Sequence, residues 1–212
     1  MQRDEVWDEA VRVVRGDVHG LVSVREDLGR RWSEPHRGYH DLRHLDEVVA
    51  ASVDLRAGVI DTDEDWAGVV LAAWFHDAVY DVADPADNEH LSAGLARASL
   101  SDHGVDPAVV DTVTSLVEAS ANHVVTQTRG PQAVFHDADL WILSAPEDRF
   151  GEYCADVRSE YASVPDAAYA QGRSAILEPL LDRPWVYRTG HARRDWEPAA
   201  RANLSRELSR LR

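Results

Sequence analysis

The segment of residues 66–80 constrains the fold more than any other part of the chain. It reads WAGVVLAAWFHDAVY, and no polar side chain occurs between Val69 and Phe75. A helix that is apolar on every side is a buried helix, and this one is too short to cross a bilayer. The sequence before it resembles a capping box: Thr62 is followed three positions later by an acid, Asp65. The sequence therefore predicts a helix in the core.

Directly after this apolar run come His76 and Asp77. An ionised carboxylate in apolar surroundings is costly unless it is paired, hydrogen-bonded or bound to a metal. The same dipeptide also occurs at His40-Asp41 and at His136-Asp137. The pair alone therefore identifies no site. The alternative to a metal site is that Asp77 caps a neighbouring element and His76 is a hydrogen-bonded core histidine.

The composition excludes several kinds of partner. A formal net charge of -16 over 212 residues argues against binding to duplex nucleic acid or to an anionic membrane. A small anionic substrate stays compatible, because a metal or a few arginines can reverse the field locally. Every basic side chain is an arginine, which excludes Schiff-base chemistry and a P-loop lysine.

Cysteine usage and the first residues bear on the compartment. The single Cys154 excludes an intrachain disulfide framework and a cysteine-cluster metal site, and it indicates a reducing compartment. The opening MQRDEVWDEAVRVV carries acids where a signal peptide needs an apolar run. We therefore expect a cytoplasmic protein.

Apolar residues recur at helical spacing through most of the chain. We expect helices over residues 4–28, interrupted at most at Gly16 or Gly20, and over residues 39–57, 62–80, 88–100, 106–123, 144–161 and 165–182, and from 195 onward. The second would carry His40 and His44 on one face, Ser144 and Glu147 would form another capping box, and Asp195 would cap the last helix. No alternation of period two predicts a sheet. The sequence predicts an all-α fold with one domain over residues 1–212.

Four side chains stand out as a candidate metal site: His44, His76, Asp77 and Asp139. Two imidazoles and two carboxylates suit Mn, Fe, Co, Ni or Zn, with Mg a further candidate, and they leave coordination positions open. Such an ion would also stabilise the carboxylate that the apolar helix disfavours.

The order of these residues resembles the H…HD…D signature of the HD superfamily of metal-dependent phosphohydrolases. The segments YHDLRH, WFHDAVYD with DNE following, HDADLWIL and EY…GR…ARANLSREL are similar to a bacterial family of predicted HD-superfamily phosphohydrolases. The likeness runs from Trp32 to Leu211. It implies an HD-type helical bundle with additional C-terminal helices. It leaves the substrate open, because the superfamily includes nucleotidases, cyclic-nucleotide phosphodiesterases, dNTP hydrolases and a few oxygenases.

The resemblance also implies roles for single residues. It makes His44, His76, Asp77 and Asp139 the metal ligands. The context Ala138-Asp139-Leu140 favours Asp139 as the closing ligand, with Asp137 as the alternative.

YHDLRH is similar to the YHNxxH of cyclic-nucleotide phosphodiesterases, in which the first histidine donates a proton. This makes His40 the candidate proton donor, although Asp41 stands where that motif has Asn. A surface histidine at a helix start is the alternative. Arg37 would neutralise the charge on the leaving group.

Further candidates for a second ion or for substrate binding are His123, Asp81, Glu89, Arg158 and Arg173. For each of them the alternative is an ordinary solvated side chain.

These patterns predict hydrolysis of a phosphate ester by a metal-activated water, catalysed by His40, Asp77 and Arg37. The expected substrate is a nucleotide or a small phosphomonoester or diester. One alternative is a mixed-valent di-iron HD oxygenase, which needs extra histidine ligands. The other is an HD module that binds a nucleotide without turning it over. The sequence leaves a homo-oligomer open.

Overall fold

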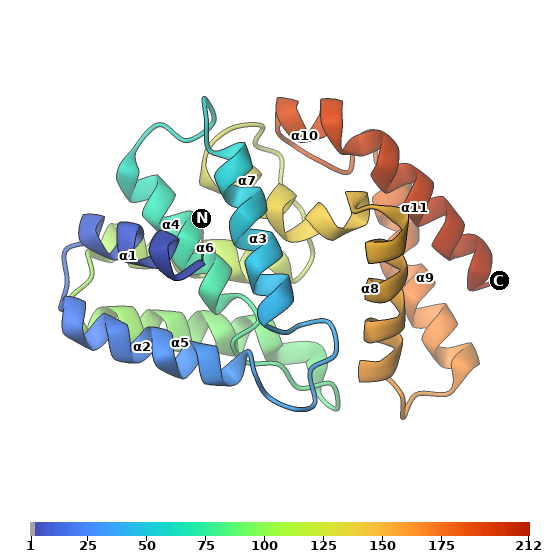
Figure 1. Cartoon of the computed structure of the whole chain (residues 1–212), viewed down its shortest axis with the longest axis horizontal. Coiled ribbons are helices and arrows are strands. Elements are labelled where there is room, and N and C mark those ends of the chain that lie inside the picture. The colour runs from blue at the N-terminus through green and yellow to red at the C-terminus, as the bar shows by residue number, and fades with distance from the viewer. Residues whose placement is uncertain (1–2) are drawn as a thin grey trace.

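All the regular secondary structure of residues 3–212, the part that the computed structural model describes, is helical (Figure 1). The α-helices are α1 (Arg3–Val13), α2 (Val18–Arg31), α3 (Leu42–Leu55), α4 (Asp63–Phe75), α5 (Asn88–Asp102), α6 (Pro107–Ser120), α7 (Pro131–Asp139), α8 (Glu147–Glu160), α9 (Asp166–Asp182), α10 (Gly190–Asp195) and α11 (Glu197–Arg210). There are also two 3₁₀ helices, η1 (Pro85–Asp87) and η2 (Leu140–Ser144). The described residues contain no strand. The predicted all-α class is confirmed.

The buried helix predicted from the apolar run is α4. Every residue from 66 to 75 is buried, and α4 packs against α1, α6 and α7. The hydroxyl of Thr62 accepts a hydrogen bond from the backbone N of Asp65 at 3.0 Å, which confirms the predicted cap. The helix ends at Phe75, with His76 as its C-cap. His76 and Asp77 therefore lie at the end of the helix and not within it.

The helix predicted over residues 4–28, with Gly16 or Gly20 as a possible interruption, is two separate helices. The chain breaks near Gly16, where a Cβ would lie 3.0 Å from the carbonyl oxygen of His103. The backbone N of Asp17 donates to the same oxygen at 2.7 Å, and its side chain caps α2 by accepting from the N of His19. Contact with the end of α5 thus overrides the helical pattern.

The helix predicted over residues 39–57 begins later, at Leu42. Asp41 is its N-cap, and its carboxylate accepts hydrogen bonds from the backbone N of Arg43 and His44. An N-cap residue leaves the helical conformation, so His40 precedes the helix instead of sharing its face with His44.

Two other predicted caps are wrong. The hydroxyl of Ser144 donates to the carbonyl of Trp141, and Pro146 occupies the N-cap of α8. Asp195 ends α10, and Trp196 is the N-cap of α11.

Helices α8, α9 and α11 lie together on one side of the molecule, away from α1, α2 and α5 (Figure 1). The link between the two groups is η2, which packs against α3, α7, α8 and α11. Asn203 on α11 donates hydrogen bonds of 2.9 Å to the carbonyls of Leu143 and Ala145. Asp139, the last residue of α7, is thereby held where the two groups meet. Within residues 3–212, no helix combines the length and apolar character needed to cross a membrane.

Candidate metal centre

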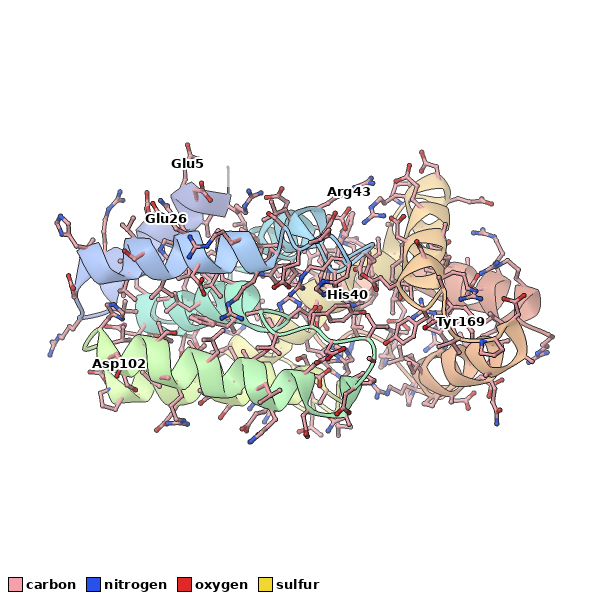
Figure 2. The ribbon with its side chains drawn as sticks, turned by 90° about the horizontal axis from the view of Figure 1, so that it is seen from below. Glu5, Glu26, His40, Arg43, Asp102 and Tyr169 are labelled. Atoms are coloured by element: carbon pink, nitrogen blue, oxygen red, sulfur yellow. The ribbon has the colours of Figure 1, made fainter. Side chains whose placement is uncertain are left out.

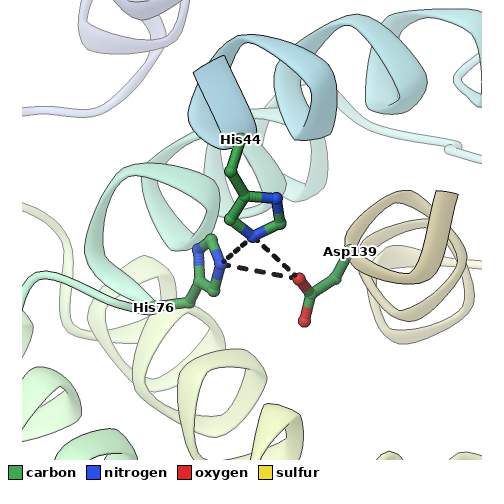
Figure 3. Close-up of side chains that lie close together, drawn as sticks. All are labelled: His44, His76 and Asp139. Carbon is green, nitrogen blue, oxygen red and sulfur yellow. Dashed lines mark hydrogen bonds and ion pairs between the residues drawn. The ribbon is translucent and has the colours of Figure 1, made fainter. Parts of the chain in front are cut away.

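Two histidines and one aspartate from three different helices converge on one point (Figure 3). His44 lies in the first turn of α3, His76 caps the C-terminus of α4, and Asp139 ends α7. The Nε2 atoms of His44 and His76 are 3.2 Å apart. Each lies 3.5 Å from Oδ1 of Asp139. This buried group could hold a metal ion.

Asp77 lies beside this cluster. Its Oδ2 is 3.1 Å from Nε2 of His76 and 3.8 Å from Nε2 of His44. All four residues that the sequence nominated as ligands are therefore neighbours.

The hydrogen bonds on the far sides of the two rings suit metal binding. Nδ1 of His76 lies 2.9 Å from the carbonyl oxygen of Ala73, which can only accept, so this nitrogen carries a proton. Nδ1 of His44 lies 2.8 Å from the hydroxyl of Tyr39. In a neutral His76 the lone pair of Nε2 then faces the cluster. Metal-binding histidines usually donate their other ring N–H in this way, so the residues present fit a divalent ion.

The electrostatics of the cluster also favour a cation. Burial lowers the pKa of His76, but the carboxylates of Asp77 and Asp139 outweigh burial and raise it to about 9. Burial lowers the pKa of His44. Burial raises the pKa of Asp139, but the imidazoles of His76 and His44 outweigh it and hold that pKa at about 2. Two ionised carboxylates therefore face the imidazoles at neutral pH, and a positive charge between them is stabilised.

Asp137 is not part of this cluster. Its two oxygens accept hydrogen bonds of 2.7 Å from the backbone N of Arg188 and of Thr189, and Nδ1 of His136 lies 2.9 Å from Oδ1. Through these hydrogen bonds Asp137 links α7 to the segment before α10. Of the two aspartates that the sequence left open, Asp139 is the one beside the histidines.

His40 is oriented by a residue that the sequence did not nominate. Its Nδ1 lies 2.8 Å from Oε2 of Glu160, whose Oε1 accepts from the backbone N of Gly38, Tyr39 and His40. Tyr80 donates its hydroxyl to Oε2 at 2.8 Å. Burial raises the pKa of Glu160, but the hydrogen bonds from His40 and Tyr80 outweigh it and hold the pKa at about 2.

An ionised Glu160 makes Nδ1 of His40 a donor and leaves Nε2 as the ring nitrogen available for proton transfer. Glu160 is 120 residues away from His40 in the sequence. No spacing in the sequence links the two residues.

Arg37 has a different role from the predicted one. Its Nη1 donates to the carbonyl oxygens of His40 and Asp77, both at 2.9 Å. Nε and Nη2 donate to Glu34, and Nη2 also donates to the carbonyl of Ala78. A guanidinium has five N–H donors, and these contacts occupy all of them. Arg37 therefore holds the backbone around the site and has no donor left for a leaving group.

Two of the further candidates lie away from the cluster. Arg158 donates to the carbonyls of Tyr161 and Val164 and pairs with Asp166, so it ties together the loop between α8 and α9. Asp81 accepts a hydrogen bond from the backbone N of Ala83 in an exposed turn. Neither residue lines the pocket around the candidate ligands.

The other three candidates do line that pocket. His123 places Nε2 3.9 Å from Oδ2 of Asp139 and is the only non-glycine residue among those described with a positive φ, 51°. Burial lowers the pKa of His123 to about 4. Burial and the nearby Asp77 raise the pKa of Glu89. Arg173 lies on α9, whereas His44 belongs to α3 and His76 caps α4.

The pocket has a volume of about 510 Å³ and two unlike sides. The candidate ligands and His40 form one side. The other consists of aliphatic side chains and tyrosines from η2, α8, α9 and the loop between α8 and α9: Leu140, Ile142, Leu143, Tyr153, Val157, Tyr161, Val164, Tyr169, Ile176, Leu177 and Leu180. His40 and Tyr169, labelled in Figure 2, lie in the two helix groups that meet here. The pocket thus joins a polar, ligand-rich end to an apolar wall.

Comparison with protein-family models, with curated proteins and with solved structures gave no significant match. The geometry of this pocket is therefore the basis for assigning a function.

Proposed function

We propose that this protein is a metal-dependent hydrolase of phosphate esters. The observation that carries the proposal is the convergence of His44, His76 and Asp139, with Asp77 beside them, at one end of a pocket large enough for a small ligand. Two imidazoles and two carboxylates are a ligand set for a divalent transition metal with open positions. When bound there, such an ion supplies an acidified water and polarises a phosphoryl oxygen.

The protein groups around the ion would divide the remaining work. His40, with Nδ1 fixed by Glu160, would transfer a proton from Nε2 to the leaving oxygen. Arg37 fixes the backbone of His40 relative to that of Asp77 by donating hydrogen bonds to both carbonyl oxygens. The apolar wall of α8 and α9 excludes water from the organic part of the substrate. An unpaired anion at the ligand end would be repelled by Asp77 and Asp139, so phosphate binding there requires the metal.

The test is metal analysis of the purified protein, followed by assays of phosphomonoesters and phosphodiesters with Mn, Co, Ni, Mg and Fe. We expect one or two divalent ions per chain and turnover of at least one ester class. Asp77→Ala should lose both the ion and the activity. Asp81→Ala, which removes a nearby exposed carboxylate outside the pocket, should keep both.

Three results would contradict the proposal. Absence of metal binding would remove its basis. Two iron atoms per chain with substrate-dependent oxygen uptake would indicate an oxygenase. Nucleotide binding without turnover, with every metal tried, would indicate a binding module.

A further inference from the structure

Arg173 is a buried cation that no carboxylate neutralises directly. The residue is only 8 % exposed, and it lines the pocket from α9. Its Nη2 donates to the hydroxyl of Tyr153, but its Nε is buried with no hydrogen-bond partner. No ion pair within residues 3–212 includes Arg173. Glu207, whose pKa the charge of Arg173 helps to lower, pairs with Arg210 at 2.8 Å.

The other buried arginines do not show this pattern. Arg149 has a buried Nη1 without a hydrogen-bond partner, but its charge is paired with Glu47 through Nε at 2.5 Å and Nη2 at 2.9 Å. Arg37 uses all its donors on Glu34 and on backbone carbonyls. A buried charge without a partner is costly, so the exception at Arg173 calls for a partner from outside the chain.

The surroundings of Arg173 define that partner. The arginine sits among tyrosines and aliphatic residues, and its guanidinium carbon lies 4.8 Å from the ring centre of Tyr153. A neutral apolar ligand would leave the free donors of Arg173 unsatisfied. An anionic oxygen would satisfy them, and the low polarity of the wall would strengthen the contact.

We propose that the substrate carries two anionic groups: a phosphate ester at the metal end and a second anion, bound by Arg173, joined by an apolar body that lies along the wall of α8 and α9. This inference rests on the proposed phosphohydrolase function and narrows its substrate class. The second anion is either a carboxylate or another phosphate, because a guanidinium binds both in the same forked geometry.

The experiment uses three series of straight-chain phosphate esters with three to ten methylene groups. One series ends in a methyl group, one in a carboxylate and one in a second phosphate. In the wild-type protein with its metal, we expect KM at the best chain length to be at least tenfold lower for a doubly anionic ester than for the methyl-ended ester of the same length. Comparison of the carboxylate and bisphosphate series identifies the second anion.

Arg173→Met should abolish this preference: KM for the doubly anionic esters should rise at least tenfold, to the value of the methyl-ended ester of the same length. Arg158→Met is the matched control, because it removes an arginine of the same helix pair that lies outside the pocket; the preference should survive. Equal losses for all three series in Arg173→Met would show a merely structural role. Should Arg173→Met not fold, the wild-type series still decides, since the absence of a preferred chain length overturns the proposal.

The two proposals can fail separately. Calorimetry with the corresponding non-hydrolysable phosphonates, ending in methyl, in carboxylate or in a second phosphonate, measures binding without turnover. Tighter binding of either doubly anionic series that depends on Arg173, in a protein that hydrolyses no ester, would refute the proposed hydrolysis and retain the two-anion site. Turnover without any advantage for a second anion would refute the two-anion site and retain the proposed hydrolysis.

Discussion

Replacing Asp139 and Asp137 separately by asparagine distinguishes a metal ligand from a structural carboxylate. Both residues belong to α7, two positions apart, and both are buried or nearly so. Asp139 faces the imidazoles of His44 and His76, whereas Asp137 accepts hydrogen bonds from backbone N–H groups. The two substitutions remove the same charge, so any difference between them comes from the surroundings.

The cost of Asp139→Asn in the metal-free protein follows from its pKa. Burial raises this pKa, but His76 and His44 outweigh burial and lower the pKa from 3.8 to about 2. At 1.36 kcal/mol per unit, the shift corresponds to about 2 kcal/mol of stability. Because the folded-state pKa is the lower one, this stability is present above pH 3.8 and is lost as the pH falls through about 2. The variant should therefore unfold about 2 kcal/mol more easily at pH 7.

With metal present, a second loss is added. Removing a carboxylate ligand should weaken binding by about 100-fold, the upper end of the range seen when residues supporting the ligands are removed. At a saturating metal concentration this corresponds to about 2.7 kcal/mol of metal-linked stability. The metal-induced rise in Tm should shrink accordingly.

Asp137→Asn should show the opposite pattern. Its carboxylate accepts from Arg188 and Thr189 at 2.7 Å, and an amide NH₂ in that place would face a donor. Breaking one side of a buried charged network costs about 3–5 kcal/mol. Metal affinity should change less than about threefold, because Asp137 does not touch the cluster.

Urea unfolding in a chelator and in Mn²⁺, together with calorimetric titration of the metal, measures both quantities. Unchanged metal affinity in Asp139→Asn would refute the assignment of the ligands. So would a large loss of affinity in Asp137→Asn while the protein remains folded.

Three further predictions concern the rest of the site. Glu160→Gln should lower kcat by about 10- to 100-fold while the metal is retained, because His40 loses the carboxylate that orients it; equal kcat would exclude that role. Metal binding at pH 7 should release about one proton, since the two carboxylates hold the pKa of His76 near 9 until an ion replaces that proton; calorimetry in buffers of different ionisation heat measures it, and zero release would contradict the ligand role. Gly38→Ala should lower the thermal unfolding temperature and kcat, because a Cβ at this position would lie 2.7 Å from a backbone oxygen of α8. The control is Gly151→Ala, whose Cβ meets no atom within 4 Å; it should leave the unfolding temperature unchanged or raise it.

The sequence predicted those features that depend on neighbouring residues. The apolar run of residues 66–75 was sufficient to predict α4, since no other environment accommodates a helix without a polar face. The cap at Thr62 depends on one hydroxyl and one N–H three positions later. The likeness in the order of His44, His76, Asp77 and Asp139 nominated four residues that the fold brings together.

The features that were missed are one local choice, the cap at Asp41, and contacts between residues far apart in the sequence. Asp41 could cap a helix or extend one, and the choice made in the fold removed His40 from the helix. Glu160 reaches His40 from 120 residues away, so no local pattern identifies it. The sequence shows that Arg37 is charged, but it does not show that backbone carbonyls and Glu34 already accept the hydrogen bonds of its guanidinium.

Arg37 explains how the chain keeps His40, the proposed proton donor, and the candidate metal ligands in fixed relation although they belong to different segments. One nitrogen of its guanidinium, Nη1, donates both to the carbonyl of His40, just before α3, and to the carbonyl of Asp77, just after α4. Glu160 fixes the same turn from α8 by accepting three backbone N–H groups and the ring of His40. Because both residues act on the backbone, the separation between His40 and the candidate ligands is set by buried hydrogen bonds and not by flexible side chains. The same α8 that supplies Glu160 also contributes Tyr153 and Val157 to the apolar wall, so displacement of this helix would disturb the orientation of His40 and the shape of the pocket together.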